Sequence, residues 1–198
     1  MKNKKDLIWL GGTLDDAAGE CFDKTARLLG FGHGGGLAIQ QTASRSEVSL
    51  RETKKTHHLP LPMLDKNNEL NFSFSGLKTA ILREVNKLKE QHKLNEKTIA
   101  QLAYDVQETI TDVLVKKTLR AAEKFSVTSI LLSGGVASNL RLRKKFSEYD
   151  SHFSIHAPPV TLCTDNAVYI ASYAYFRGVT TDWKTITAVP DLSVEVTD

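Results

Sequence analysis

The stretch "SILLSGGVASNLRLRKKF", Ser129–Phe146, decides the fold class of this chain. Apolar residues run into the pair Gly134 and Gly135, and a basic pattern with helical spacing follows, which predicts a strand, a turn and a helix. Downstream, a second strand is predicted at 152–157 and a helix at about 165–177. Strands that alternate with helices in this way predict an α/β layer with a partly parallel sheet.

A glycine-rich segment lies between two predicted helices in the first third of the chain. After a strand predicted at 6–10, Thr13 and Asp16 form a capping-box-like pair, and the helix they open is predicted to stop at Gly30. "GHGGG", residues 32–36, then has four glycines in five positions. Such a loop is either flexible or shaped around a ligand, since its conformational entropy is costly to lose. It is not a P-loop, because no Gly-Lys-Ser/Thr follows.

Two apolar stripes predict helices in the middle of the chain. Residues 44–58 are polar and lack periodicity, so they are interpreted as a loop, and 70–75 as a strand. Ser75 is predicted to cap an amphipathic helix. Asn95 is predicted to open a long helix that runs to about Phe125 with a wide apolar face.

Composition bounds the class of protein. The chain has 198 residues, 41% of them apolar, and a net charge of +3 from 26 basic and 23 acidic residues. This length supports one domain or two small ones, with a core that needs neither disulfides nor metal. Cys21 and Cys163 lack metal-ligand spacing and fit a reducing compartment. With no apolar run of membrane length or signal-peptide type, we expect a cytoplasmic protein in which Trp183 anchors the irregular tail.

Several polar residues near the predicted turns are candidate ligand contacts, and each also has a structural explanation. The turn at Gly134 and Gly135 follows a strand, where ligands of α/β proteins usually bind, and Asn139 could contact a ligand or cap a helix. Asp23 could bind ribose hydroxyls or lie at the surface. Asp165 could cap a helix or bind a divalent cation, and its spacing alone favours the cap.

Two further patterns resemble sites but have simpler interpretations. His152 and His156 are predicted on a strand, where four residues span roughly 13 Å, too far for one metal ion. The basic cluster that includes Arg141, Arg143 and Lys144 could contact phosphates, although a solvated helix face is the commoner explanation.

Five segments, taken together and in order, resemble one family. They are "GGTLDDAAGECFDKTARLLGFGHGGG" (11–36), "LPLPML" (59–64), "NFSFSGLKTA" (71–80), "LLSGGVASNLRLR" (131–143) and "LCTDNA" (162–167). The family is that of the TsaD-type tRNA threonylcarbamoyladenosine transferases, long labelled O-sialoglycoprotein endopeptidases. The resemblance covers about residues 7–178 and is to the bacterial or organellar branch.

The resemblance implies the actin-like ATPase (ASKHA) fold, in which two lobes enclose a nucleotide. We expect this chain to be the second lobe with a helical insertion, the first lobe being absent as a truncation or as a separate chain. Residues 1–12 would then end the first lobe. Residues 13–125 would form a linker helix, the glycine loop and the insertion, and 126–198 the second-lobe α/β core, joined by strand 70–75.

The resemblance also implies roles for four residues and assigns no catalytic side chain. Asp23 and Gly36 correspond to positions that bind the nucleotide or adenylate, and Asn139 to the asparagine of the adenosine motif. Asp165 corresponds to a ligand of a divalent metal, whether iron, zinc or magnesium, which reverses the interpretation from spacing.

The sequence departs from the family pattern at three places. Gly34 stands where a proline is usual, and Gln40 where a carboxylate is common, so a weakened ribose contact is expected. The family's other metal ligands are histidines of an H-x-x-x-H motif in the first lobe. His152 and His156 lie in the wrong segment to replace them.

By resemblance, the complete protein moves a threonylcarbamoyl group from threonylcarbamoyl-AMP to N6 of adenosine 37 of tRNA. This chain would supply half of the nucleotide and metal site and be inactive alone. Expected partners are tRNA, the first lobe, TsaB- and TsaE-like proteins and a second copy, with no membrane. The alternative is a non-catalytic module that binds nucleotide, or that binds a partner through helices at 76–89 and 96–124. A metalloprotease is disfavoured because the histidines are absent.

Overall fold

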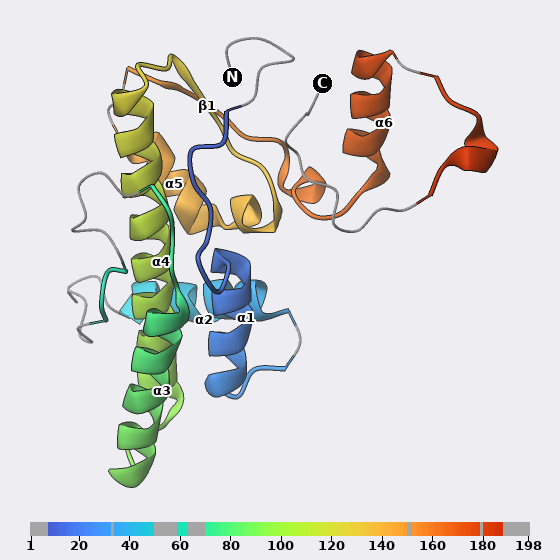
Figure 1. Cartoon of the computed structure of the whole chain (residues 1–198). Helices are drawn as coiled ribbons and strands as arrows, with labels where there is room; N and C mark the ends of the chain where they lie inside the picture. Colours follow the sequence, from blue (N-terminus) through green and yellow to red (C-terminus); the bar gives the residue numbers. More distant parts are fainter. Residues whose placement is uncertain are drawn as a thin grey trace.

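A computed structural model describes residues 8–32, 34–49, 59–62, 70–149, 152–178 and 180–187. This part of the chain is mostly helical, with one two-stranded parallel sheet (Figure 1). The elements are helices α1 (Ala18–Leu28), α2 (Gly35–Ser49), α3 (Ser75–Glu90), α4 (Glu96–Lys124), α5 (Leu140–Glu148) and α6 (Ala167–Arg177), strands β1 (Ser129–Leu131) and β2 (Ser154–His156), and 3₁₀ turns η1 (Gly135–Ser138), η2 (Val160–Leu162) and η3 (Trp183–Thr185). None of the helices described here combines the length and the apolar character needed to cross a bilayer.

The long helix α4 forms the centre of the packing, and its prediction is confirmed. Asn95 caps it by accepting a hydrogen bond from the backbone N–H of Thr98 at 3.1 Å. Its apolar stripe, which includes the fully buried Leu102, Val106 and Ile110, packs within one hydrophobic core shared with α1, α2 and α3. The other end of α4 packs against α5, so α4 connects the helical body to the strand layer.

Helix α3 begins where a distant carboxylate caps it. Asp15 accepts hydrogen bonds from the backbone N–H groups of Phe74 at 2.7 Å and Ser75 at 3.2 Å. It also accepts from the hydroxyls of Ser73 at 2.5 Å and Ser75 at 2.6 Å. Partial burial works to raise the pKa of Asp15, but these four bonds hold that pKa well below its usual range. Ser75 is therefore the first residue of the helix, and Asp15 supplies the cap predicted for Ser75.

The start of α1 differs from the prediction. Thr13 is not its N-cap: the hydroxyl of Thr13 donates to the carbonyl of Asp16 at 2.7 Å, in a turn before the helix. The helix begins at Ala18, and the Glu20 carboxylate accepts from the N–H of Ala17 at 3.4 Å. The physical reason is that the intervening Asp15 is held by α3, so the chain cannot wind into a helix there. Gly30, with φ +86°, follows the C-cap as predicted.

The sheet is smaller than predicted. β1 and β2 pair in parallel, with Ile130 opposite Ile155, which confirms both strands of the last third. The predicted strand at 70–75 is wrong, because only Phe72 pairs, in a single parallel bridge with Thr13. The bonds to Asp15 turn the chain into α3 immediately afterwards. Of the strand predicted at 6–10, residues 8–10 are irregular and the rest lies outside the described residues.

Helix α2 is longer than predicted, and the tail is less well anchored. Residues 44–49, interpreted as a loop, continue α2, whose buried Ile39 and Ala43 join the core beside α4. The remainder of the predicted loop, 50–58, lies outside the described residues. Trp183 is 75% exposed and is not an anchor, because η3 buries no side chain.

Helix α6 stands apart from the helical body in Figure 1. Asn166 caps its start by accepting from the N–H groups of Val168 and Tyr169, and Gly178, with φ +65°, ends it as predicted. Large apolar side chains of α6 are exposed around the helix: Val168, Tyr169, Ile170, Tyr173, Tyr175 and Phe176. Exposed apolar surface of this extent is unusual for a helix of a monomeric protein.

Candidate functional site

A cavity of about 550 Å³ lies where the α1–α2 region meets the turn after β1. Its volume is within the range of small-molecule sites. The lining combines backbone glycines, apolar side chains and a few polar groups: Gly19, Phe22, Asp23, Gly34, Gly36, Leu37, Gln40, Gly135, Val136, Ser138, Asn139, Leu140, Val160 and Thr164. The structure thus brings Asp23, Gly36 and Asn139, three residues predicted as ligand contacts, to one cavity.

The glycine loop between α1 and α2 serves both packing and the cavity. Gly34 has φ +79°, a conformation that side chains disfavour. A Cβ on Gly35 would lie 2.4 Å from Oδ1 of Asp23, so Gly35 lets α2 pack directly against α1. A Cβ on Gly36 would meet only the Cβ of Phe22, at 4.0 Å. Gly34 and Gly35 are thus required by the backbone, whereas Gly36 leaves space in the cavity.

The turn after β1 forms the opposite wall. Gly134 has φ +84°, and η1 follows before α5 begins at Leu140, whereas the sequence predicts a helix near 137–149. A Cβ on Gly135 would meet no atom within 4 Å. Because Gly135 lines the cavity, a ligand can approach its backbone directly.

Asn139 combines the two roles that the sequence left open. Its side chain caps α5, since Oδ1 accepts from the N–H of Leu142 at 3.0 Å. Its Nδ2 donates to Oε1 of Gln107 on α4 at 3.2 Å, although Asn139 also lines the cavity. Sequence reasoning missed Gln107, because it appears only as a polar residue within the buried stretch of a helix.

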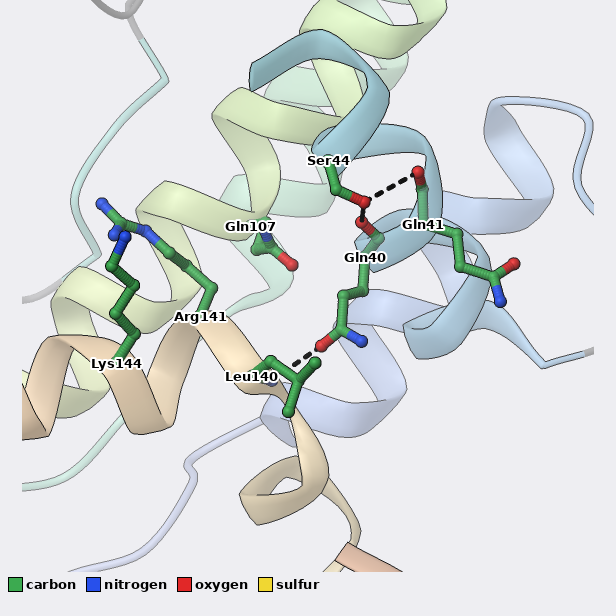
Figure 2. A pocket seen from close by; sticks show the side chains of 7 residues that line it. All are labelled: Gln40, Gln41, Ser44, Gln107, Leu140, Arg141 and Lys144. Carbon is green, nitrogen blue, oxygen red and sulfur yellow. Dashed lines mark hydrogen bonds between the residues drawn. The ribbon is translucent and has the colours of Figure 1, made fainter. Parts of the chain in front are cut away.

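Gln40 joins α2 to the start of α5. Its Oε1 accepts from the N–H of Leu140 at 2.7 Å. Gln40 and Leu140 line both the large cavity and a second one of about 230 Å³. Figure 2 shows this second cavity, with Gln40 reaching from α2 to Leu140 and Gln107 lying on α4 behind them. The bond between Gln40 and Leu140 therefore lies between the two cavities.

Arg141 and Lys145 of the basic helix α5 bind to α4, whereas Lys144 is exposed to solvent. Arg141 donates to both carboxylate oxygens of Glu108, at 2.6 and 2.9 Å, and Lys145 donates to Asp112 at 2.6 Å. Burial works to raise the pKa of Glu108, but Arg141 and Lys145 lower it below its usual value. Arg143 donates to the carbonyls of Ala137 and Pro158 and to Sγ of Cys163. These contacts place the loop after β2 beside the cavity.

The described residues do not fit a complete metal site. Asp165 is exposed, between Thr164, which lines the cavity, and Asn166, which takes the cap position at α6. No group of three His, Cys, Asp or Glu side chains able to hold a metal occurs in the described part of the chain. His152 and His156 are exposed near β2, consistent with a structural role.

The helical body, the small parallel sheet and the glycine-walled cavity define a mostly helical protein of the α/β class with a site of small-molecule size. Residues 1–172 match the family described as "TsaD: tRNA N6-adenosine threonylcarbamoyltransferase". The chain belongs to the TsaD family. Membership implies an ASKHA fold and a metal, and proteins of this family act on tRNA.

Curated relatives agree with this assignment. Three that carry the name tRNA N6-adenosine threonylcarbamoyltransferase come from Persephonella marina, Sulfurihydrogenibium sp. and Thermosipho africanus. They are 40%, 41% and 39% identical over 92%, 89% and 98% of this chain, respectively. The matches cover 52%, 48% and 57% of the relatives, so the chain spans about half the length of the curated relatives it matches.

Proposed function

We propose that this chain is part of a TsaD-type transferase and that its large cavity binds the adenylate of threonylcarbamoyl-AMP. One observation carries the proposal: Asp23, Gly36 and Asn139, far apart in the sequence, line the same cavity. They are the three positions to which the family resemblance assigns nucleotide contacts.

The cavity has the chemistry that an adenine nucleotide needs. Phe22, Leu37 and Val136 provide apolar walls for a flat base, while Gly36 and Gly135 leave room for it beside the backbone. Polar groups of the same cavity can bind a ribose: the Asp23 carboxylate, the Gln40 carboxamide and the Ser138 hydroxyl. The Asp23 carboxylate accepts hydrogen bonds from hydroxyl groups, as a ribose contact requires.

In the proposed reaction, the N6 amino group of the tRNA adenosine attacks the carbonyl carbon of the threonylcarbamoyl group. The bond from that carbon to the phosphate oxygen breaks, AMP leaves with that oxygen negatively charged, and the proton lost from N6 passes to solvent. The residues of this chain hold the leaving AMP and fix its orientation, which lowers the entropy cost of the attack. The family implies a metal, but Asp165 alone cannot hold one, and no step of this proposal passes through it.

The proposal extends to the arrangement of the whole protein. The chain would be the second lobe, with 13–125 and 126–198 as its insertion-containing and core parts, after a first-lobe remnant at 1–12. Asp165 would contribute one ligand to a metal whose other ligands come from the first lobe. Partners would be tRNA, TsaB- and TsaE-like proteins and a second copy, in the cytoplasm.

Calorimetric titration of the chain with AMP tests the proposed site. We expect saturable binding with one site per chain, which Asp23→Ala weakens because it removes the ribose acceptor. Asp182→Ala, a matched change of an exposed aspartate in the distant η3 region, should leave the affinity unchanged. Absence of binding at millimolar AMP would contradict the nucleotide site.

The second candidate function, a module that binds a protein partner, is favoured by the exposed apolar side chains of α6. The two functions differ in what the chain recognises. A chain that binds no AMP but associates through α6 would be such a module. A chain that binds AMP retains the nucleotide half-site, whatever α6 contacts.

A further inference from the structure

The carboxamide of Asn139 is held by two bonds whose directions fix its orientation. A backbone N–H can only donate, so the atom facing the N–H of Leu142 must be Oδ1. The Nδ2 group consequently faces Gln107, whose Oε1 lies 3.2 Å away and accepts one of its two hydrogens. The orientation of this amide therefore follows from the bonding partners and does not depend on a choice between oxygen and nitrogen.

Gln107 is almost fully buried beside Asn139. Gln107 lies on α4 and is 3% exposed, and Asn139 is 7% exposed. The next residue, Glu108, binds Arg141 and Lys145 of α5. Two successive side chains of α4 thus hold α5: Gln107 through the N-cap Asn139, and Glu108 through Arg141 and Lys145.

These contacts leave few hydrogen-bond donors at the start of α5 available to a ligand in the cavity. The Gln40 side chain accepts a hydrogen bond from the N–H of Leu140, and the Asn139 side chain accepts one from the N–H of Leu142. These two N–H groups of the first turn of α5 have no partner within the helix and are therefore already bonded by side chains. The second hydrogen of the Asn139 Nδ2 has no partner among the described residues. It is the donor that this residue can offer to a ligand in the cavity.

We infer that Gln107 is a positioning residue: the N–H of Leu142 holds Oδ1 of Asn139, and the bond from Nδ2 to Gln107 fixes the direction in which Asn139 presents a hydrogen-bond donor to the bound nucleotide. The ligand atom that bonds to Nδ2 of Asn139 is then a hydrogen-bond acceptor, such as a ring nitrogen of adenine or a sugar oxygen. This inference rests on the proposed nucleotide site. It adds that α4, a helix outside the glycine walls, sets the selectivity of one contact in that site.

The test measures AMP affinity of the whole chain carrying Gln107→Leu. Loss of one oriented hydrogen bond should weaken AMP binding by about 3- to 10-fold. The matched control is Gln101→Leu on the same helix, where Gln101 is buried and donates to Asp105 at 3.0 Å, away from the cavity. It also removes a buried hydrogen bond, but it should leave the AMP affinity unchanged.

A double substitution separates positioning from a general structural effect. Asn139→Ser keeps a cap for α5 but removes the carboxamide. If Gln107 acts through Asn139, then adding Gln107→Leu to Asn139→Ser causes no further loss of AMP affinity. A second loss equal to that of the single variant would overturn the inference, as would a Gln107→Leu variant with unchanged affinity.

Side-chain amide signals in a ¹⁵N-correlated NMR spectrum give a readout without nucleotide. The Asn139 amide should show slowed hydrogen exchange in the wild type and in Gln101→Leu, and fast exchange in Gln107→Leu. Failure of the wild type to bind AMP would overturn the proposed function and this inference together. AMP binding that does not depend on Gln107, or an Asn139 amide that exchanges fast in the wild type, would overturn only the inference.

Discussion

Among the glycines, the structure separates those required by the backbone from those that leave room for a ligand. Gly34 and Gly134 have positive φ, and Gly35 lies too close to Asp23 for any side chain. Gly36 and Gly135 have neither restriction. At these two positions a methyl group fits the fold but enters the cavity.

We therefore predict that Gly36→Ala and Gly135→Ala weaken AMP binding at least tenfold and lower the thermal midpoint little. Alanine at such positions restricts the unfolded chain and is tolerated in the folded one. Gly32→Ala is the control, because a Cβ there meets no atom within 4 Å and Gly32 does not line the cavity. Calorimetric titration and thermal unfolding measure both effects. Unchanged affinity in both cavity variants would contradict the assigned binding surface.

At the scale of the element, the cap that Asp15 supplies to α3 is predicted to contribute about 1 kcal/mol to the free energy of unfolding. Asp15→Ala should remove it, because two backbone N–H groups then lose their acceptor. Chemical denaturation measures the difference. Asp182→Ala, which removes an exposed cap on the short turn η3, should have a smaller effect.

The same cap predicts a dependence on pH. Since the folded pKa of Asp15 is depressed, the unfolded chain binds more protons between the folded value and the usual one near 3.9. The stability that Asp15 provides is therefore complete above about pH 4 and declines as the pH falls further. The difference between wild type and Asp15→Ala should shrink over that range. A difference that stayed constant down to pH 2 would argue against the carboxylate as the cap.

Elements that depend on neighbouring residues could be predicted from the sequence, and those that depend on distant partners could not. Helix α4 begins and ends close to the predicted residues, because its cap and its apolar stripe are local signals. The start of α1 was misplaced because Asp15 bonds to residues about sixty positions away. Likewise Asn139 was identified as a candidate, whereas its partner Gln107, 32 positions earlier, was not.

At the scale of the whole molecule, α6 leaves its large apolar side chains exposed. We predict that replacing Tyr175 and Phe176 together by serine lowers binding of an apolar fluorescent dye and barely changes the thermal midpoint. The reason is that both rings are exposed, at 81% and 72%. Phe146→Ser is the contrasting change, since Phe146 is 2% exposed in the core beside β1 and its loss should cost several kcal/mol.

The opposite result for α6 would also be informative. A large fall in the thermal midpoint of the Tyr175 and Phe176 double variant would mean that α6 is covered in solution. Sedimentation at several protein concentrations would then identify whether a second copy covers it.

The bond between Gln40 and Leu140 joins residues 100 positions apart, so we expect it to form late in folding. Loops of such length are slow to form, because contacts distant along the chain are made only after the intervening segments are ordered. A partly folded intermediate with α3 and α4 in place would still lack one wall of the cavity. If the cavity binds AMP as proposed, AMP stabilises only the state in which both walls of the cavity are formed, by RT ln(1 + [AMP]/Kd). Under this scheme, AMP slows unfolding but does not accelerate the early steps of folding, because it binds only after both walls of the cavity have formed.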